Sequence, residues 1–479
     1  MDAPATLQPK TFRLAFAGLL LAMLLGSLDQ TIVSTALPTI VRDLGGLDQL
    51  SWVVTAYLLG ATVSMPLWGR ASDVHGRKRL FVAAITVFLA GSALSGLAGS
   101  LGQLIAFRAL QGLGAGGLMT LAMALVAEIV PPRERGRYQG YIQMIFVAAS
   151  VAGPLLGGLL TDHASWRWIF YVNLPIGAAV LALVSVGLDV PAHKGEARVD
   201  YLGAALLAGA LTCLLLFTTW GGQEYAWGSA EIVGLGIGAL SLFVAWVVQQ
   251  RRAVEPILPL RLFANPVFTI VSGTLFCATL AFFAVIVFIP VFLQVVTGAS
   301  ATGSGLLLLP LLLASTASTM VAGRVMSATG RYKLFPVTGL ALMAVGLVLL
   351  SQMDAGTPRT TVSLLLILFG IGFGMVSQIL TVALQNAVER RDLGIATASA
   401  NLVRSLGGSI GVAVFGAVFA GRLDRQPGEV AGLDPAAVAD ALQPVFLVAA
   451  PFALAGFLIV LLLPETPVAT APAAAGSAR

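Results

Sequence analysis

Residues 69–79 have the sequence GRASDVHGRKR, and residues 323–333 carry the related sequence GRVMSATGRYK, 254 positions later. The same offset aligns two glycine pairs inside predicted helices, Gly153 with Gly407 and Gly157 with Gly411. Two independent matches at one offset indicate that the chain consists of two related halves. Parallel six-helix repeats, with a substrate site between them near the bilayer midplane, describe one large class of secondary transporters.

The composition is that of an integral membrane protein. Hydrophobic residues make up 58% of the 479 residues and charged residues only 10%, and the mean hydropathy is +0.93. Soluble domains carry about 25% charged residues. The two cysteines, Cys213 and Cys277, lie far apart in apolar segments, so they predict neither a disulfide framework nor a metal site. The net charge of +5 does not indicate nucleic-acid binding, because its distribution follows the membrane topology.

Fourteen segments are predicted to cross the membrane, since a hydrocarbon core about 30 Å thick needs about 20 apolar helical residues. They lie at approximately 13–38, 50–69, 80–99, 103–128, 138–160, 168–188, 201–220, 231–249, 267–293, 303–323, 334–352, 361–386, 396–420 and 443–463. The predicted fold class is an all-α integral membrane protein, with two six-helix bundles and two inserted transmembrane helices. The predicted domains are 1–190, the inserted pair with its linkers at 191–260, 261–463, and a disordered tail at 464–479.

Positive charge predicts the orientation of the spans. Placing both termini in the cytoplasm puts 20 of the 27 Lys and Arg residues on that side, 5 outside and 2 within spans. If one span were missed or added, every later loop would be assigned to the opposite side of the membrane and the asymmetry would be lost. The observed asymmetry therefore supports fourteen spans. The expected location is the plasma membrane, crossed many times, with cytoplasmic termini.

Asp29 is the acidic residue that lies deepest in a predicted span. A charged residue at the bilayer centre costs roughly 2.5–3.5 kcal/mol on insertion scales, so it usually has a functional reason. Arg108, in the fourth span, lies at a depth that differs from that of Asp29 by about one helical turn. The pair could meet directly or through water, and Arg108 would keep Asp29 ionised until the two separate. A permanent ion pair that only fixes helix packing is the alternative.

The motifs together resemble the major facilitator superfamily, and within it the fourteen-span drug:proton antiporters, over nearly the whole chain. The resemblance rests on residues 28–38 of span one, the loop at 69–79, Arg108 and the residues that follow it in span four, and the span-five stretch at 153–158. In the loop, the matching residues are Gly69, Asp73, Gly76, Arg77 and Lys78. The resemblance implies that they form a charge latch between the halves, and the alternative is a plain basic loop. Asp73 is expected to complement the dipole of span three.

The span-five residues Gly153, Pro154, Gly157 and Gly158 resemble the antiporter signature of the superfamily, which implies export rather than import. A generic small-residue packing face is the alternative, because such spacing is common in membrane helices. Trp166 to Phe170 and Asn173 to Gly177 resemble a further element of the same fourteen-span family. In the second half, Arg404 is expected to act in packing or gating near the cytoplasm, and Glu128 is expected to be a surface acid near a span end.

Six residues are candidates for binding substrate, because aromatic, Met and amide groups suit apolar ligands of variable shape: Tyr57, Gln143, Met144, Gln294, Gln378 and Asn386. A single interior acid could also attract cations. The expected function is export of hydrophobic or cationic drugs or antibiotics by alternating access, with Asp29 as the proton carrier.

Two other classes of function are alternatives. The first keeps the fold but changes the cargo to lipid or to a self-made metabolite. The second is a membrane enzyme or a non-transporting receptor, which is disfavoured because the sequence has no intramembrane His-rich or Cys-rich metal cluster and no nucleophile elbow. The absence of a P-loop argues against an ATP-driven pump. The protein is therefore predicted not to be an enzyme, to need no cofactor, and to work as a monomer.

Overall fold

A computed structural model describes residues 9–44, 50–131, 134–188, 200–222, 225–253, 256, 258, 261–299, 301–389, 392–423 and 434–464. The predicted tail at 464–479 lies outside the described residues apart from Pro464. The helices are α1 (Pro9–Leu44), α2 (Leu50–His75), α3 (Arg77–Leu97), α4 (Leu101–Ile129), α5 (Arg135–His163), α6 (Trp168–Tyr171), α7 (Asn173–Gly187), α8 (Tyr201–Trp220), α9 (Ala230–Arg252), α10 (Arg261–Ala264), α11 (Pro266–Val291), the π-helix η2 (Phe292–Val296), α12 (Ala301–Thr329), α13 (Leu334–Leu350), α14 (Arg359–Ala387), α15 (Leu393–Leu423) and α16 (Pro435–Leu461).

The described residues contain 13 helical segments that are long and apolar enough to cross a membrane. Helix α13 is a further apolar helix of 17 residues. These fourteen correspond one for one to the predicted spans, with α6 and α7 together forming the sixth. The predicted fold class of an all-α, many-span membrane protein is therefore confirmed.

Contacts divide the chain into two compact units. Unit 1 comprises Met1–Ile129, Met144–Leu262 and Glu389–Leu402, and unit 2 comprises Val130–Gln143, Phe263–Val388 and Val403–Arg479. The helix pairs that pack in unit 1 (α2 with α4, α3 with α4, α1 with α7) have counterparts in unit 2 (α12 with α14, α13 with α14, α11 with α16). The internal repeat in the sequence thus has a matching repeat in the packing.

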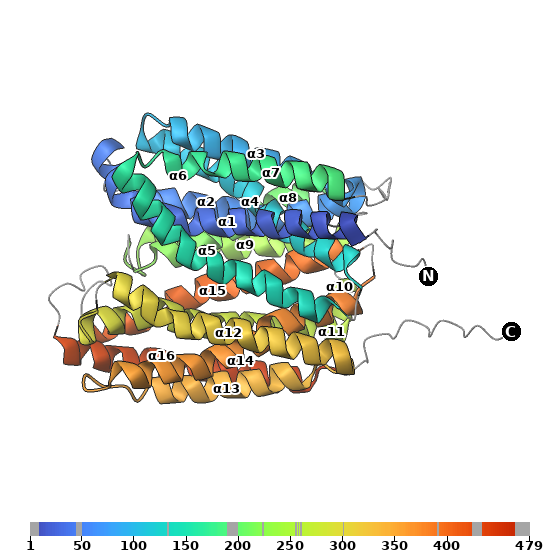
Figure 1. The fold of residues 1–479 in the computed structure, drawn as a ribbon. Helices are drawn as coiled ribbons and strands as arrows, with labels where there is room; N and C mark the ends of the chain where they lie inside the picture. Colours follow the sequence, from blue (N-terminus) through green and yellow to red (C-terminus); the bar gives the residue numbers. More distant parts are fainter. Residues whose placement is uncertain are drawn as a thin grey trace. The chain divides into compact units, whose positions relative to one another are not determined.

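Helices α8 and α9, which separate the two halves in the sequence, form an antiparallel pair within unit 1 (Figure 1). Each begins at a side-chain cap: Asp200 accepts from the Gly203 amide at 2.9 Å, and Ser229 accepts from the Ile232 amide at 3.3 Å. Such caps satisfy amides that a helix start leaves unpaired. The Asp200 carboxylate also accepts from Gln250 Nε2 at 3.0 Å, which joins the start of α8 to the end of α9.

The loop predicted at 69–79 is mostly helical. Helix α2 continues through it to His75, and α3 begins at Arg77, so the turn consists of Gly76 alone. Gly76 has φ of 93°, a backbone conformation that glycine adopts without a side-chain clash. Gly69 lies inside α2 and is needed there for close packing, described below.

Glycines of α4 set how closely α2 approaches it. A Cβ atom on Gly112 would overlap the Tyr57 carbonyl oxygen, and a Cβ atom on Gly116 would overlap the Ala61 carbonyl oxygen. Both glycines are buried. Small residues at helix contacts allow backbones to come together in membranes, and this contact places the Tyr57 ring beside Arg108.

Candidate functional site

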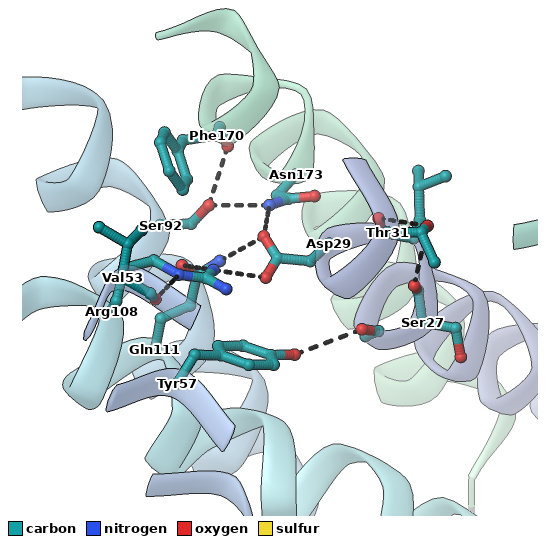
Figure 2. A network of polar contacts seen from close by, with 12 residues as sticks. Ser27, Asp29, Thr31, Val53, Tyr57, Ser92, Arg108, Gln111, Phe170 and Asn173 are labelled. Atoms are coloured by element: carbon teal, nitrogen blue, oxygen red, sulfur yellow. Dashed lines mark hydrogen bonds and ion pairs between the residues drawn. The ribbon is translucent and has the colours of Figure 1, made fainter. Parts of the chain in front are cut away.

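Asp29 lies at the centre of a buried polar network that joins α1, α4 and α7 (Figure 2). Arg108 of α4 donates from Nη1 to Asp29 Oδ2 at 2.7 Å. Gln111 of the same helix donates from Nε2 to Asp29 Oδ1 at 2.7 Å. Asn173, the first residue of α7, donates from Nδ2 to that same Oδ1 at 2.8 Å. The carboxylate therefore accepts three hydrogen bonds, one of them from a cation.

A second layer of contacts orients these donors. Asn173 Nδ2 also donates to Ser92 Oγ of α3 at 2.9 Å, and Ser92 Oγ donates to the Phe170 carbonyl at 2.9 Å (Figure 2). Arg108 Nη1 also donates to Gln111 Oε1 at 2.8 Å, and Arg108 Nε donates to the Val53 carbonyl at 3.4 Å. Each of the three residues that donate to Asp29 is thereby held by a neighbouring group. A small rotation of one side chain would therefore disturb several hydrogen bonds together.

Aromatic rings enclose the guanidinium of Arg108. Its Cζ lies 4.0 Å from the centre of the Tyr57 ring and 5.8 Å from that of Phe170. Cation–π contact of this kind contributes most when the cation is desolvated. The Tyr57 hydroxyl donates to the Gly26 carbonyl of α1 at 3.3 Å, so the ring also bridges α2 and α1.

Asp29 is 0% exposed and Arg108 is 1% exposed, so the ion pair has no contact with solvent. Desolvation offsets much of the attraction within a buried pair, and removing one partner costs about 3–5 kcal/mol because the other charge is left unpaired. The two residues were expected to lie about one helical turn apart in depth, and the structure brings them into direct contact. The arrangement can hold a charged carboxylate deep in the protein while Arg108 stays beside it.

Three members of the Asp29 site were not expected there from the sequence: Gln111, Ser92 and Asn173. A signal was available for two of them. Gln111 follows Arg108 by three residues and so lies on the same face of α4. Asn173 lies five residues into the predicted span 168–188, which is the same distance that separates Arg108 from the start of its span at 103. Comparing depths for amides as well as charges would have placed Asn173 beside Asp29, whereas Ser92 carried no comparable signal.

The predicted latch residues contact the start of α15. Asp73 accepts from the Ile395 amide at 2.9 Å and from the Gly394 amide at 3.2 Å. A carboxylate near a helix N-terminus is favoured by the helix dipole. Asp73 was expected to complement span three, but it lies in the last turn of α2 and complements α15 instead. Sequence separation conceals this contact, since the partners lie more than 320 residues apart.

Arg77 links Asp73 to Glu128. Its Nη2 donates to Asp73 Oδ1 at 3.0 Å and its Nη1 donates to Glu128 Oε2 at 2.8 Å. Glu128 was expected to be a surface acid, and the structure instead pairs it with Arg77. Lys78 donates from Nζ to the Ser185 carbonyl at 3.0 Å. Gly69 permits the close approach of α15, because a Cβ atom there would lie 2.5 Å from Ala398 Cβ.

The span-five glycines have unequal surroundings. A Cβ atom on Gly153 would overlap Thr31 Oγ1 and lie 2.6 Å from Thr31 Cβ, whereas a Cβ atom on Gly158 would have nothing within 4 Å. Thr31 Oγ1 donates to the Ala149 carbonyl at 3.0 Å, so α5 lies against α1 two residues beyond Asp29. Gly157 is buried in α5. Pro154 lies within α5, but its side chain is outside the described residues.

Replacing Gly153 by alanine is therefore expected to destabilise the protein by about 1–3 kcal/mol, the usual cost of overpacking. It should also lower the activity proposed below, as α5 moves away from the Asp29 region. Thermal unfolding of the purified protein and an assay of that activity measure the two effects. Gly158→Ala is the matched control on the same helix and should leave both near wild type. Equal effects of the two substitutions would contradict this account. Adding Thr31→Ala to Gly153→Ala should partly restore the stability that Gly153→Ala loses.

Comparison with known proteins identifies the family. Residues 19–412 match the model of the Major Facilitator Superfamily, which covers well over half of the chain. This protein is a member of the Major Facilitator Superfamily. It is 43% identical over 489 aligned positions to an uncharacterized MFS-type transporter of Mycobacterium tuberculosis, with 96% of this chain and 71% of that protein covered. It is 37% identical to the multidrug transporter protein MdtP of Bacillus subtilis, with 85% of this chain and 75% of that protein covered.

Solved structures agree on the fold of this superfamily member. The proton:xylose symporter XylE matches with a TM-score of 0.66 and 16% identity, covering 96% of this chain and 98% of that one. The family match, the transporter relatives and the many apolar helices together make the chain a multi-pass membrane transporter. Among the described residues, no group of three or more His, Cys, Asp or Glu side chains is placed to hold a metal ion.

The six predicted substrate residues of this transporter have different surroundings. Tyr57 is 3% exposed and belongs to the Asp29 network. In unit 2, Gln378 Nε2 donates to Gln143 Oε1 at 3.3 Å, which is the one hydrogen bond between two members of the set among the described residues. Tyr57 is thus better described as a support for Arg108, and the Gln143–Gln378 pair remains a prediction as a substrate contact.

The other three candidates are placed as follows. Asn386 Oδ1 accepts from Arg135 Nη1, and Gln294 Nε2 donates to Ser304 Oγ at 3.0 Å. Met144 is 44% exposed. Their roles in substrate binding also remain predictions.

Proposed function

We propose that this transporter is a proton-coupled antiporter of the fourteen-span drug:proton group, which exports hydrophobic or cationic drugs or antibiotics from the cytoplasm. The observation that carries the proposal is the fully buried Asp29–Arg108 pair with its added amide donors. An intramembrane acid and its cation commonly mark a proton relay in transporters. The multidrug name of a relative with 37% identity and the resemblance of residues 153–158 to the antiporter signature support the direction of transport.

The proposed cycle uses alternating access of the two sequence halves. Substrate enters from the cytoplasm and displaces the proton of Asp29, which Arg108 then holds in its ionised form. The halves rock, substrate leaves on the outside, and movement of Arg108 away from Asp29 favours protonation of the carboxylate. The protonated carrier returns to the inward-facing state, where the next substrate molecule displaces this proton. The latch formed by Asp73, Arg77 and the start of α15 opens and closes once in each cycle.

We place the protein in the plasma membrane as a monomer with both termini in the cytoplasm, as the distribution of Lys and Arg supports. The driving reaction exchanges protons for cargo, so the chain itself forms no covalent intermediate. A dedicated metabolite or a lipid is the alternative cargo and is an outcome of the test below.

The test is ethidium efflux from energised cells that express wild type, Asp29→Asn or Asp43→Asn, each with and without a protonophore. Asp43 provides a matched control, because it is an exposed acid on the same helix and bonds to Trp166 Nε1 at 3.0 Å. We expect wild type and Asp43→Asn to extrude dye in a protonophore-sensitive way. We expect Asp29→Asn to lose export while reaching the membrane and unfolding cooperatively.

Two other results would change the proposal. Undiminished dye export by Asp29→Asn would exclude Asp29 as the proton carrier. Absence of any dye export by wild type would exclude the drug-export proposal for this dye class and favour lipid or a dedicated metabolite as cargo.

A further inference from the structure

Arg404 is a second arginine deep in the membrane, and its contacts differ from those of Arg108. It lies 11 residues after Leu393, the first residue of α15, which corresponds to a depth of about 16 Å along the helix. Its polar contact among the described residues is Ser377 Oγ of α14, 3.5 Å from Nη1. It forms no ion pair with a described residue. A guanidinium carries five N–H donors, so most of them lack a protein acceptor here.

Among the described residues, no free carboxylate lies at the depth of Arg404. Among the described residues, Asp29 is the one acid more than two helical turns from the end of its helix. Asp29 already accepts three hydrogen bonds and is paired with Arg108. Because that pair is neutral as a unit, the uncompensated charge in the interior is the positive charge of Arg404. An intramembrane cation of this kind is expected to border a water-filled path rather than lipid.

Aromatic side chains of unit 2 lie next to Arg404. Gly408, four residues further along α15, lies against the Phe283 ring, since a Cβ atom there would be 2.7 Å from Phe283 Cε2. Phe373, four residues before Ser377 on α14, stacks on Phe282 with ring centres 4.0 Å apart. Residues four apart lie on the same face of a helix.

The three rings of Phe282, Phe283 and Phe373 are partly exposed, as is Arg404. Exposed rings beside a cation form an amphipathic surface. A planar apolar ligand would cover the rings, and a carboxylate would fit the fork of the guanidinium with two parallel hydrogen bonds.

We propose that Arg404 anchors a cargo subsite on unit 2 that binds an aromatic molecule carrying a carboxylate, with Phe282, Phe283 and Phe373 beside it. The inference rests on the proposed export function and adds to its cargo a class of hydrophobic molecules that bear an acidic group. It replaces the expectation that Arg404 acts in packing or gating. A cation such as ethidium would use the export path without this anchor.

The experiment measures binding of 1-naphthoate and of its neutral analogue 1-naphthamide to the purified full-length protein by titration calorimetry at neutral pH. Arg404→Gln is expected to weaken naphthoate binding about ten- to a hundredfold, as loss of a charged hydrogen bond does. Naphthamide binding should change much less. Arg404→Lys keeps the charge without the fork and should fall between wild type and Arg404→Gln. Arg422→Gln is the matched control at the exposed end of the same helix.

The outcomes separate this inference from the proposed function. A wild-type protein that binds naphthoate no better than naphthamide would overturn the subsite, as would an equal loss of both ligands in Arg404→Gln, which indicates a packing or gating role. If Arg404→Gln does not fold, the loss of naphthoate binding relative to the loss of naphthamide binding in Arg404→Lys decides between a cargo subsite and a packing or gating role. Arg404-dependent binding of naphthoate in a protein whose dye efflux ignores the protonophore would leave the subsite standing and reject proton-coupled export.

Discussion

Substitution of Arg108 by glutamine is expected to abolish proton-driven export and to destabilise the protein by about 3–5 kcal/mol, because it leaves Asp29 buried without its cation. The Asp29 carboxylate, at 0% exposure, would then have no cation beside it and no contact with solvent. Arg108→Lys should be intermediate in stability, because lysine cannot reproduce both the bond to Asp29 and that to the Val53 carbonyl. Thermal unfolding and dye efflux measure these effects.

The double variant Asp29→Asn with Arg108→Gln decides whether the pair carries protons or only packs helices. Removing both charges restores neutrality, so its stability should recover relative to either single variant, with a coupling energy of about 0.5–3 kcal/mol or more in the cycle. If the pair has only a structural role, export should recover together with stability. If Asp29 is the proton carrier, the double variant should be stable and inactive.

The sequence predicted the membrane architecture in detail, because each span carries its own signal of length and hydropathy. Helix α13 has 17 residues, fewer than a membrane-spanning helix usually has, yet it occupies the eleventh predicted span. The contact between Asp29 and Arg108 was also within reach, because helix register alone fixes relative depth. Charges are rare in spans, so few pairings had to be considered.

What the sequence did not predict depends on contacts between distant residues. Nothing near Asp73 indicates that its carboxylate lies at the amides of Gly394 and Ile395, and the nearest helix start, that of α3, was the natural but wrong choice. The difference between Gly153 and Gly158 was likewise hidden, because a small residue reveals nothing about which atoms surround it.

Replacing Asn173 by leucine is expected to lower export roughly tenfold or more at neutral pH, because it removes one of the three donors to the Asp29 carboxylate. Asn173 donates to Asp29 Oδ1 at 2.8 Å, and a hydrogen bond to a charged group contributes about 1.5–3 kcal/mol. Dye efflux at neutral pH measures this loss.

Ser92 and Ser95 supply a matched pair of controls for this prediction. Both are fully buried serines of α3, but Ser92 Oγ accepts from Asn173, whereas Ser95 Oγ has no hydrogen-bond partner among the described residues. Ser92→Ala should lower export in the same way as Asn173→Leu but less, because Asn173 keeps its hydrogen bond to Asp29 and loses only the one to Ser92. Ser95→Ala removes the same atom one turn away and should leave export near wild type. Equal losses of export in Ser92→Ala and Ser95→Ala would mean that these serines act only through packing of α3. Undiminished export by Asn173→Leu would mean that Arg108 and Gln111 alone hold the Asp29 carboxylate.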